Sequence, residues 1–273
     1  MARTNFLSVA LAAAALLSLV RPATAEPSWP AFVDLGRGQD IDEDYRAQFG
    51  LCDTENHFRD EDFSRRRSCA DDPNQVTALR RLPSGAVAYV SKLAVDLDGS
   101  ALACGPARGP SDQCPTSLML PDASGALQPV DADRIPYVVI PNMGPPQNRG
   151  EFDRLTGVRV GDFGVVIWRG VAVPVIVADT GPYNKLGEGS LALHRALGHD
   201  QCAERDAAGV CVRGVEPMTS IEDGVVTLLF PGTARPDLTA ENLEETVRRE
   251  GARLWAEHQA EIAPPARARL GAR

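Results

Sequence analysis

The chain has 273 residues, of which 28 are Lys or Arg and 37 are Asp or Glu, so its formal net charge at pH 7 is −9. Such a balance repels nucleic acid and anionic lipid and favours cationic partners, although many proteins carry negative charge only for solubility. We therefore expect no nucleic-acid partner and no membrane partner, and the length suits one large domain as well as two small ones.

The N-terminal segment is typical of a secretory signal. Arg3 supplies positive charge, residues 6–20 form an apolar run too short for a membrane span, and an A-x-A cleavage signal ends at Ala25. We predict that residues 1–25 are removed and that the protein is secreted, to the periplasm or the medium. The alternative is an uncleaved N-terminal anchor.

Six cysteines occur in the chain, an even number that predicts disulfide bonds in a secreted protein. Sequence proximity suggests three local pairs, although other connectivities stay open. The suggested pairs are Cys52 with Cys69, Cys104 with Cys114, and Cys202 with Cys211. No C-x-x-C occurs and the histidines do not lie beside cysteines at zinc-site spacing, so we expect no metal.

Strand patterns begin after a polar, charged stretch. Residues 26–84 predict a loop-rich N-terminal arm, and alternating apolar residues from Gly85 onward predict a strand that ends at the Asp98-Gly99 turn. Four further strands are predicted over residues 135–141, 165–168, 171–178 and 225–230. The middle two form a hairpin around Arg169-Gly170, with Pro174 at an edge position or a bulge.

Helical patterns are fewer. Ser190 is a suitable N-cap for a short helix over residues 191–197, and Gly198 supplies its stop. A longer helix starts near Thr239, with one apolar face, and a disordered tail covers 261–273. Many strands with few helices predict a mainly β fold, in which a closed or nearly closed barrel with peripheral helices occupies residues 85–260.

The segment DTGPYNKLGEGS places Asp179 and Glu188 among glycine, proline and small polar residues. A strand would deliver Asp179 at its end, and a glycine-rich loop would deliver Glu188 before a helix N-terminus. Inverting glycoside hydrolysis needs two carboxyl groups about 6.5–9.5 Å apart, and loops on a rigid sheet often carry such groups. The alternative is structural, because Asp-Thr-Gly-Pro forms ordinary turns and Glu188 can complement the helix dipole.

Four sequence blocks favour the catalytic interpretation. KLAVDLDGS, RIPYVVIP, GDFGVVIW and DTGPYNKLGEGSLAL resemble successive blocks of the fungal and bacterial chitosanases of glycoside hydrolase family 75, over about Ser91 to Phe230. The resemblance implies a six-stranded barrel of the double-psi type, and hydrolysis of β-1,4 bonds within chitosan with inversion by Asp179 and Glu188. We assign Glu188 as general acid and Asp179 as general base, and the reverse order stays open. We also expect a monomeric enzyme without a cofactor.

Chitosan carries protonated amines, which pair with carboxylates through charge-assisted hydrogen bonds. Asp96 and Asp98 are candidates for recognising an amino group, and the alternative is a turn-forming Asp98 with a solvated Asp96. Tyr183 and Lys185 are candidates for lining the cleft, Lys185 by holding a carboxylate ionised.

Two other classes of function stay open. One is a non-catalytic cell-wall protein of the same barrel type that binds amino-sugar polymers. The other is a peptidoglycan-lytic enzyme, which the sequence disfavours because acetylation removes the positive charge that acidic side chains would recognise.

Overall fold

The structure is a computed structural model that describes residues 33–62, 68–105 and 113–262. The predicted signal segment and residues 263–273 of the predicted tail lie outside the described residues. None of the helices in the described part of the chain is both long and apolar enough to cross a membrane.

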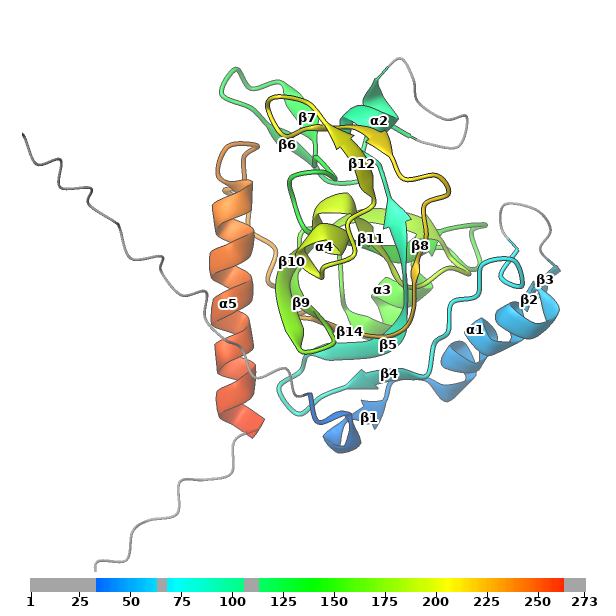
Figure 1. Cartoon of the computed structure of the whole chain (residues 1–273). Helices are drawn as coiled ribbons and strands as arrows, with labels where there is room; N and C mark the ends of the chain where they lie inside the picture. Colours follow the sequence, from blue (N-terminus) through cyan, green and yellow to red (C-terminus); the bar gives the residue numbers. More distant parts are fainter. Residues whose placement is uncertain (1–32, 63–67, 106–112, 263–273) are drawn as a thin grey trace, which may run out of the picture.

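Six strands close into a barrel (Figure 1) in the order β5, β11, β8, β10, β9 and β14, and β14 pairs back with β5. The bounds are β5 Val87–Asp96, β8 Tyr137–Met143, β9 Phe163–Trp168, β10 Val171–Pro182, β11 Glu188–Ser190 and β14 Ile221–Leu229. The pairs β5–β11 and β8–β10 are parallel and the other four are antiparallel. The predicted mainly β fold, a six-stranded barrel with peripheral helices, is confirmed.

Further strands lie beside the barrel. β4 pairs with β5 and β1 pairs with β4, so both extend the sheet from the barrel wall. Three two-stranded ribbons, β2–β3, β6–β7 and β12–β13, complete the described strands. Their bounds are β1 Gln39–Asp40, β2 His57–Phe58, β3 Glu61–Asp62, β4 Ala78–Arg81, β6 Met119–Pro121, β7 Leu127–Pro129, β12 Cys202–Arg205 and β13 Cys211–Gly214.

The hairpin predicted around Arg169-Gly170 is confirmed as the pair β9–β10, since Trp168 pairs with Val171. Both turn residues have positive φ, which suits a two-residue hairpin turn. At Pro174, strand β10 pairs with β9 on one side only. Its pairing with β8 on the other side begins at Ile176. The missing N–H of Pro174 therefore costs no ladder hydrogen bond on the β8 side.

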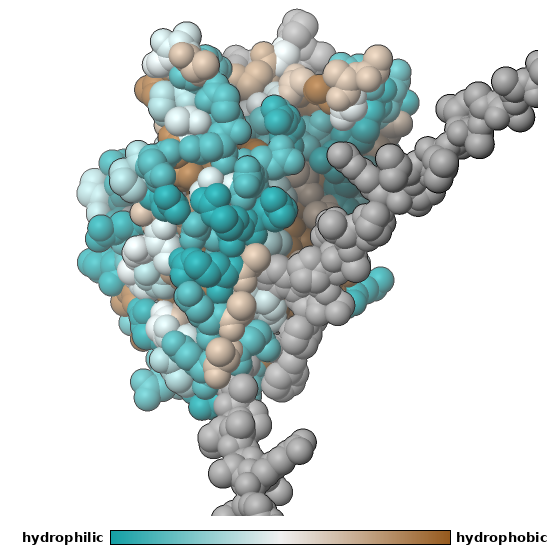
Figure 2. Space-filling model, turned by 90° about the vertical axis from the view of Figure 1, so that its left-hand side faces the viewer, coloured by the Kyte–Doolittle hydropathy of each residue, from teal (hydrophilic) through white to brown (hydrophobic). Residues whose placement is uncertain are grey.

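The barrel wall separates two cores. Along β8, Val138 and Ile140 belong to the core inside the barrel, whereas Tyr137 and Val139 belong to the core on its outer face. Helix α5 (Leu243–Ile262) packs on β9 and β10 (Figure 1) and covers part of that outer face, and its side of the molecule is mainly hydrophilic (Figure 2). Its buried apolar residues are those of the predicted helix face, Leu243, Val247, Leu254 and Trp255.

The other helices are short except one. The predicted helix after Ser190 is α4 (Leu191–Ala196), and the Ser190 Oγ accepts a hydrogen bond from the Leu193 N–H. Helices α2 (Ala101–Cys104) and α3 (Glu151–Thr156) are one or two turns long, and η1 (Leu35–Arg37) is a 3-10 turn. The first α-helix, α1 (Glu43–Glu55), lies in the arm, for which the sequence predicts loops. Its sequence is polar, and only four of its side chains are buried, so it has little apolar periodicity.

All three suggested disulfides are confirmed: Cys52–Cys69, Cys104–Cys114 and Cys202–Cys211. Three such bonds suit an oxidising, extracellular environment. The first of them joins the arm to the segment that follows Asp179, since the Asn184 Nδ2 donates to both of its sulfurs at 3.4 and 3.3 Å. Next to it, the buried Asn74 Oδ1 accepts from the Leu186 N–H at 2.8 Å. The arm therefore fixes the chain between Asp179 and Glu188.

Candidate active site

Asp179 and Glu188 lie on either side of strand β8. Val139 of β8 is the register partner of Asp179 on β10 and of Glu188 on β11. Paired residues of a sheet point to the same face and adjacent strands are about 4.8 Å apart, so the two Cα atoms are separated by roughly 9–10 Å. A Cα separation of this size allows the carboxyl groups themselves to lie within the range of about 6.5–9.5 Å that inverting glycosidases use.

The structure corrects the prediction that a loop delivers Glu188. Glu188 is the first residue of strand β11, which pairs with β5 on one side and with β8 on the other. Gly187, just before it, has φ +91°, and a Cβ there would lie 2.3 Å from the Lys92 carbonyl oxygen. Only glycine fits this close approach, and it places the Glu188 carboxyl group at a fixed point of the sheet.

Both acids line one open cavity of about 600 Å³. None of its described lining residues is Lys, Arg or His, whereas five carry a carboxyl group. These five are Asp72, Asp96, Asp98, Asp179 and Glu188. The cavity is therefore built for a ligand that carries positive charge or many hydrogen-bond donors.

A second cavity of about 540 Å³ continues the first. The two share the lining residues Gln113, Met143 and Pro182, and the second extends to Glu61 and Pro145. Together they form a groove along the surface rather than a closed pocket, which suits an extended chain molecule.

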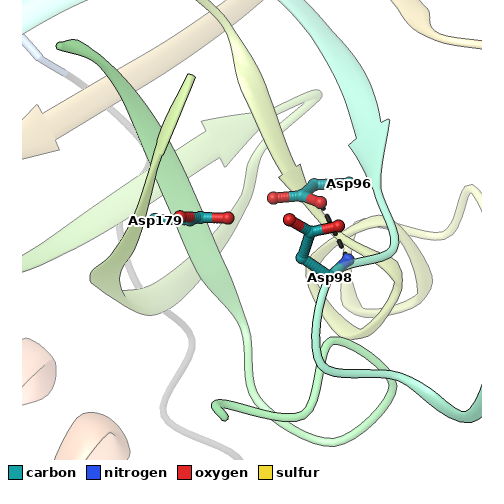
Figure 3. A group of neighbouring side chains, drawn as sticks. All are labelled: Asp96, Asp98 and Asp179. Carbon is teal, nitrogen blue, oxygen red and sulfur yellow. Dashed lines mark hydrogen bonds between the residues drawn. The ribbon is translucent and has the colours of Figure 1, made fainter. Parts of the chain in front are cut away.

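Three of the acids form a tight cluster (Figure 3). One carboxylate oxygen each of Asp96, Asp98 and Asp179 lies within 4.8 Å of the others, and the Asp179 side chain points from β10 toward the two acids at the end of β5. The Asp98 backbone N–H donates to the Asp96 Oδ1 at 2.9 Å. Three carboxylate oxygens form a donor set that suits an ammonium group or a hard cation such as Ca²⁺ or Mg²⁺.

One oxygen of Asp179 accepts several hydrogen bonds. Its Oδ1 accepts from the Ser117 N–H at 2.9 Å, from the Ser117 Oγ at 2.6 Å and from the Thr180 N–H at 2.7 Å. These bonds fix the carboxyl group and leave Oδ2 for another partner. Neither Ser117 nor its role was expected, since it lies 62 residues before Asp179 and belongs to no motif.

Burial and the neighbouring negative charges of Asp96 and Asp179 raise the pKa of Asp98 to about 8. The Asp98 and Asp179 carboxyl groups face each other, with one oxygen of each within 4.8 Å (Figure 3). Two ionised carboxylates this close repel each other, which favours the protonated form of Asp98 at neutral pH. The buried Tyr137 adds a hydrogen bond from its hydroxyl to the Asp98 carbonyl oxygen at 2.9 Å.

Glu188 also retains its proton at neutral pH. Burial, and then the charge of Asp96, raise its pKa to about 8, while the ammonium group of Lys92 opposes the shift. Asp179 contributes a smaller rise. The site therefore presents a protonated carboxyl group on β11 and a second carboxyl group on β10 across Val139.

Tyr183 does not take the position expected for it, whereas Lys185 lies beside the cavity and helps to keep a carboxylate ionised, that of Asp72. Tyr183 is 2% exposed, packs on Phe58 with ring centroids 5.4 Å apart, and does not line the cavity. The Lys185 Nζ binds Asp72, at 3.1 Å from Oδ2 and 2.6 Å from the carbonyl oxygen, rather than Asp179 or Glu188. Sequence spacing gave no sign of Asp72, because it comes from the arm.

Comparison with known proteins adds no further support, since no protein-family model matches the chain and no curated protein matches it significantly.

Proposed function

We propose that the protein is a secreted, inverting glycoside hydrolase that cleaves β-1,4 bonds within chitosan. The observation that carries this proposal is the placement of Asp179 and Glu188 on either side of Val139, in an open groove with an acidic lining. The sequence blocks that resemble family 75 chitosanases supply the same two residues.

The two acids have different roles because their protonation states differ. Glu188, protonated at neutral pH, gives its proton to the glycosidic oxygen as the bond from that oxygen to the anomeric carbon breaks. Asp179 takes a proton from a water molecule whose oxygen bonds to the anomeric carbon from the opposite face. The product has the inverted configuration, and each turnover returns a proton to Glu188 and removes one from Asp179.

The acidic lining accounts for the choice of substrate. Ammonium groups along deacetylated chitosan pair with carboxylates, and no cation among the described lining residues competes for them. Asp96 and Asp98 recognise one amino group, as expected from the sequence, and Asp98 accepts from it through the oxygen that does not carry the proton. Peptidoglycan and chitin carry acetylated nitrogens and lack this charge.

The decisive test is to remove each catalytic carboxyl group. Glu188→Gln and Asp179→Asn should each lower the release of reducing ends from chitosan by at least ~10²-fold. The matched control is Glu257→Gln on the exposed side of α5, which should leave the rate unchanged. Wild-type rates in either folded catalytic variant would refute the proposal, as would retention of configuration in the first product observed by proton NMR.

The protonation of Glu188 sets the alkaline limit of activity. Because the acid must hold its proton, kcat/KM should fall as pH rises through about 8. The measurement uses soluble chito-oligosaccharides, which stay dissolved across the range. A kcat/KM that stays constant well above this pH would exclude Glu188 as the acid.

A substrate comparison separates the remaining alternatives. Highly deacetylated chitosan, chitin and peptidoglycan should be cleaved in decreasing order, with the last two near background. Retention of the protein on chitosan without a drop in viscosity would instead indicate a binding protein.

A further inference from the structure

A buried lysine lies beside the proposed general acid. Lys92 on β5 is 2% exposed, and lysine is almost never buried unless it is paired. Its ammonium group forms an ion pair with the Asp72 carboxylate and donates to the Asp72 carbonyl oxygen at 3.3 Å. Asp72, which comes from the arm, therefore stabilises the buried positive charge of Lys92.

The register brings Lys92 to Glu188. Ala94 is the strand partner of Glu188, and Lys92 precedes Ala94 by two residues, so it points to the same face of the sheet. Lys92 and Glu188 both line a small cavity of about 150 Å³ next to the main groove, together with Asp72. The lysine is thus a diagonal neighbour of the acid and lines the same small cavity.

Other charged groups also face Glu188. They come from β5 and the turn after it, from β10, from the arm and from the segment before β11: Asp96, Asp98, Asp179, Asp72 and Lys185. The charges of the acids favour the protonated form of Glu188, whereas Lys92 favours the ionised form. Lys185 lines the same small cavity and binds the Oδ2 atom of Asp72 at 3.1 Å.

We propose that Lys92 is a positioning residue for Glu188, and that its ammonium group, held by Asp72, sets the pH range in which Glu188 keeps its proton. This inference rests on the proposed role of Glu188 as general acid. It assigns a function to the arm as well: the arm, held by the Cys52–Cys69 disulfide, carries Asp72 just after Cys69 to the site and so takes part in tuning the acid.

Two substitutions should shift the pH profile in opposite directions. Lys92→Met removes the cation, so the Glu188 pKa rises and the alkaline limb of kcat/KM should move up by about one pH unit or more. Asp72→Asn removes an anion, so the Glu188 pKa falls and the limb should move down. Lys185→Met is the matched control, because it removes the other lysine bound to Asp72, and it should shift the limb less than Lys92→Met does.

A titration that needs no activity separates this inference from the proposed function. The Glu188 carboxyl carbon, assigned in a ¹³C-labelled protein by its loss in Glu188→Gln, should titrate at higher pH in Lys92→Met and at lower pH in Asp72→Asn. These shifts without chitosan hydrolysis would support the electrostatic role and refute the function. Identical titrations in wild type and Asp72→Asn, which alters a half-exposed side chain, would overturn the inference even if Lys92→Met failed to fold.

Discussion

Individual carboxyl groups in this protein differ because their surroundings differ. The pKa values of Asp98 and Glu188 are both raised to about 8, because each is partly buried among other acids. The proposed roles of the two nevertheless differ: Glu188 lines the groove as the proposed proton donor, whereas Asp98, with an oxygen within 4.8 Å of one of Asp179, is placed to donate to the proposed base. A neutral group at position 98 that can still donate should therefore preserve the chemical step.

Asp98→Asn tests this assignment, because an amide donates a hydrogen bond much as a protonated carboxyl group does. We expect kcat within a few-fold of wild type at pH 6, with a higher KM from weaker amine binding. Asp98→Ala should lower kcat by about 10-fold or more, since Asp179 loses an orienting partner. Steady-state kinetics on chito-oligosaccharides measures both constants, and equal losses of kcat in the two variants would contradict the donor role.

At the scale of the elements, three adjacent strands set the geometry of the site. β10 and β11 each carry one acid, and β8 between them supplies Val139 as the spacer. The short β11 fits against β5 only because Gly187 lets its backbone approach Lys92 closely. The distance between the two acids thus depends on one glycine as much as on the acids.

Gly187→Ala should destabilise the protein by at least ~3 kcal/mol, since it combines a strained positive φ with a clash against backbone. Gly198→Ala is the matched control: its φ is +84° but open space surrounds its Cβ position, so the cost should stay near ~1 kcal/mol. Urea unfolding measures both free energies. Equal costs would show that the close approach to Lys92 has no energetic weight.

At the scale of the whole molecule, charge and shape agree with one another. The chain carries a net charge of −9, and the described lining of the cavity that holds Asp179 and Glu188 has acids but no Lys or Arg. The groove continues past Met143 toward Glu61, so an extended polycation would contact acids along its length. Long-range attraction of this kind acts mainly on binding.

Salt should therefore weaken substrate binding more than catalysis. Raising NaCl from about 20 to about 300 mM shortens the Debye length severalfold, and KM for deacetylated chito-oligosaccharides should rise several-fold while kcat changes little. The control is a partly acetylated oligosaccharide of the same length, whose KM should respond less. A KM independent of salt for both substrates would show that the acidic lining does not recognise charge.

The sequence by itself determined the elements whose signals are local. Alternation of apolar residues along β5, the short apolar run of β8, the turn at Arg169-Gly170 and the Ser190 cap are all contained within a few neighbouring residues, and the structure confirms each. The three disulfides also join near neighbours in the chain. Asp179 and Glu188 could be singled out because one short motif contains both.

Only the tertiary structure decided what surrounds that motif. β11 forms because β5 and β8 lie on either side of it, and its three residues show no strand pattern of their own. Tyr183 is buried, and Lys185 is bound to Asp72, because the arm folds back over the loop. The hydrogen bonds of Ser117 and the charge of Lys92 likewise act across segments that only the closed barrel brings together. Burial and proximity fix the protonation of the acids, and neither can be read from local sequence.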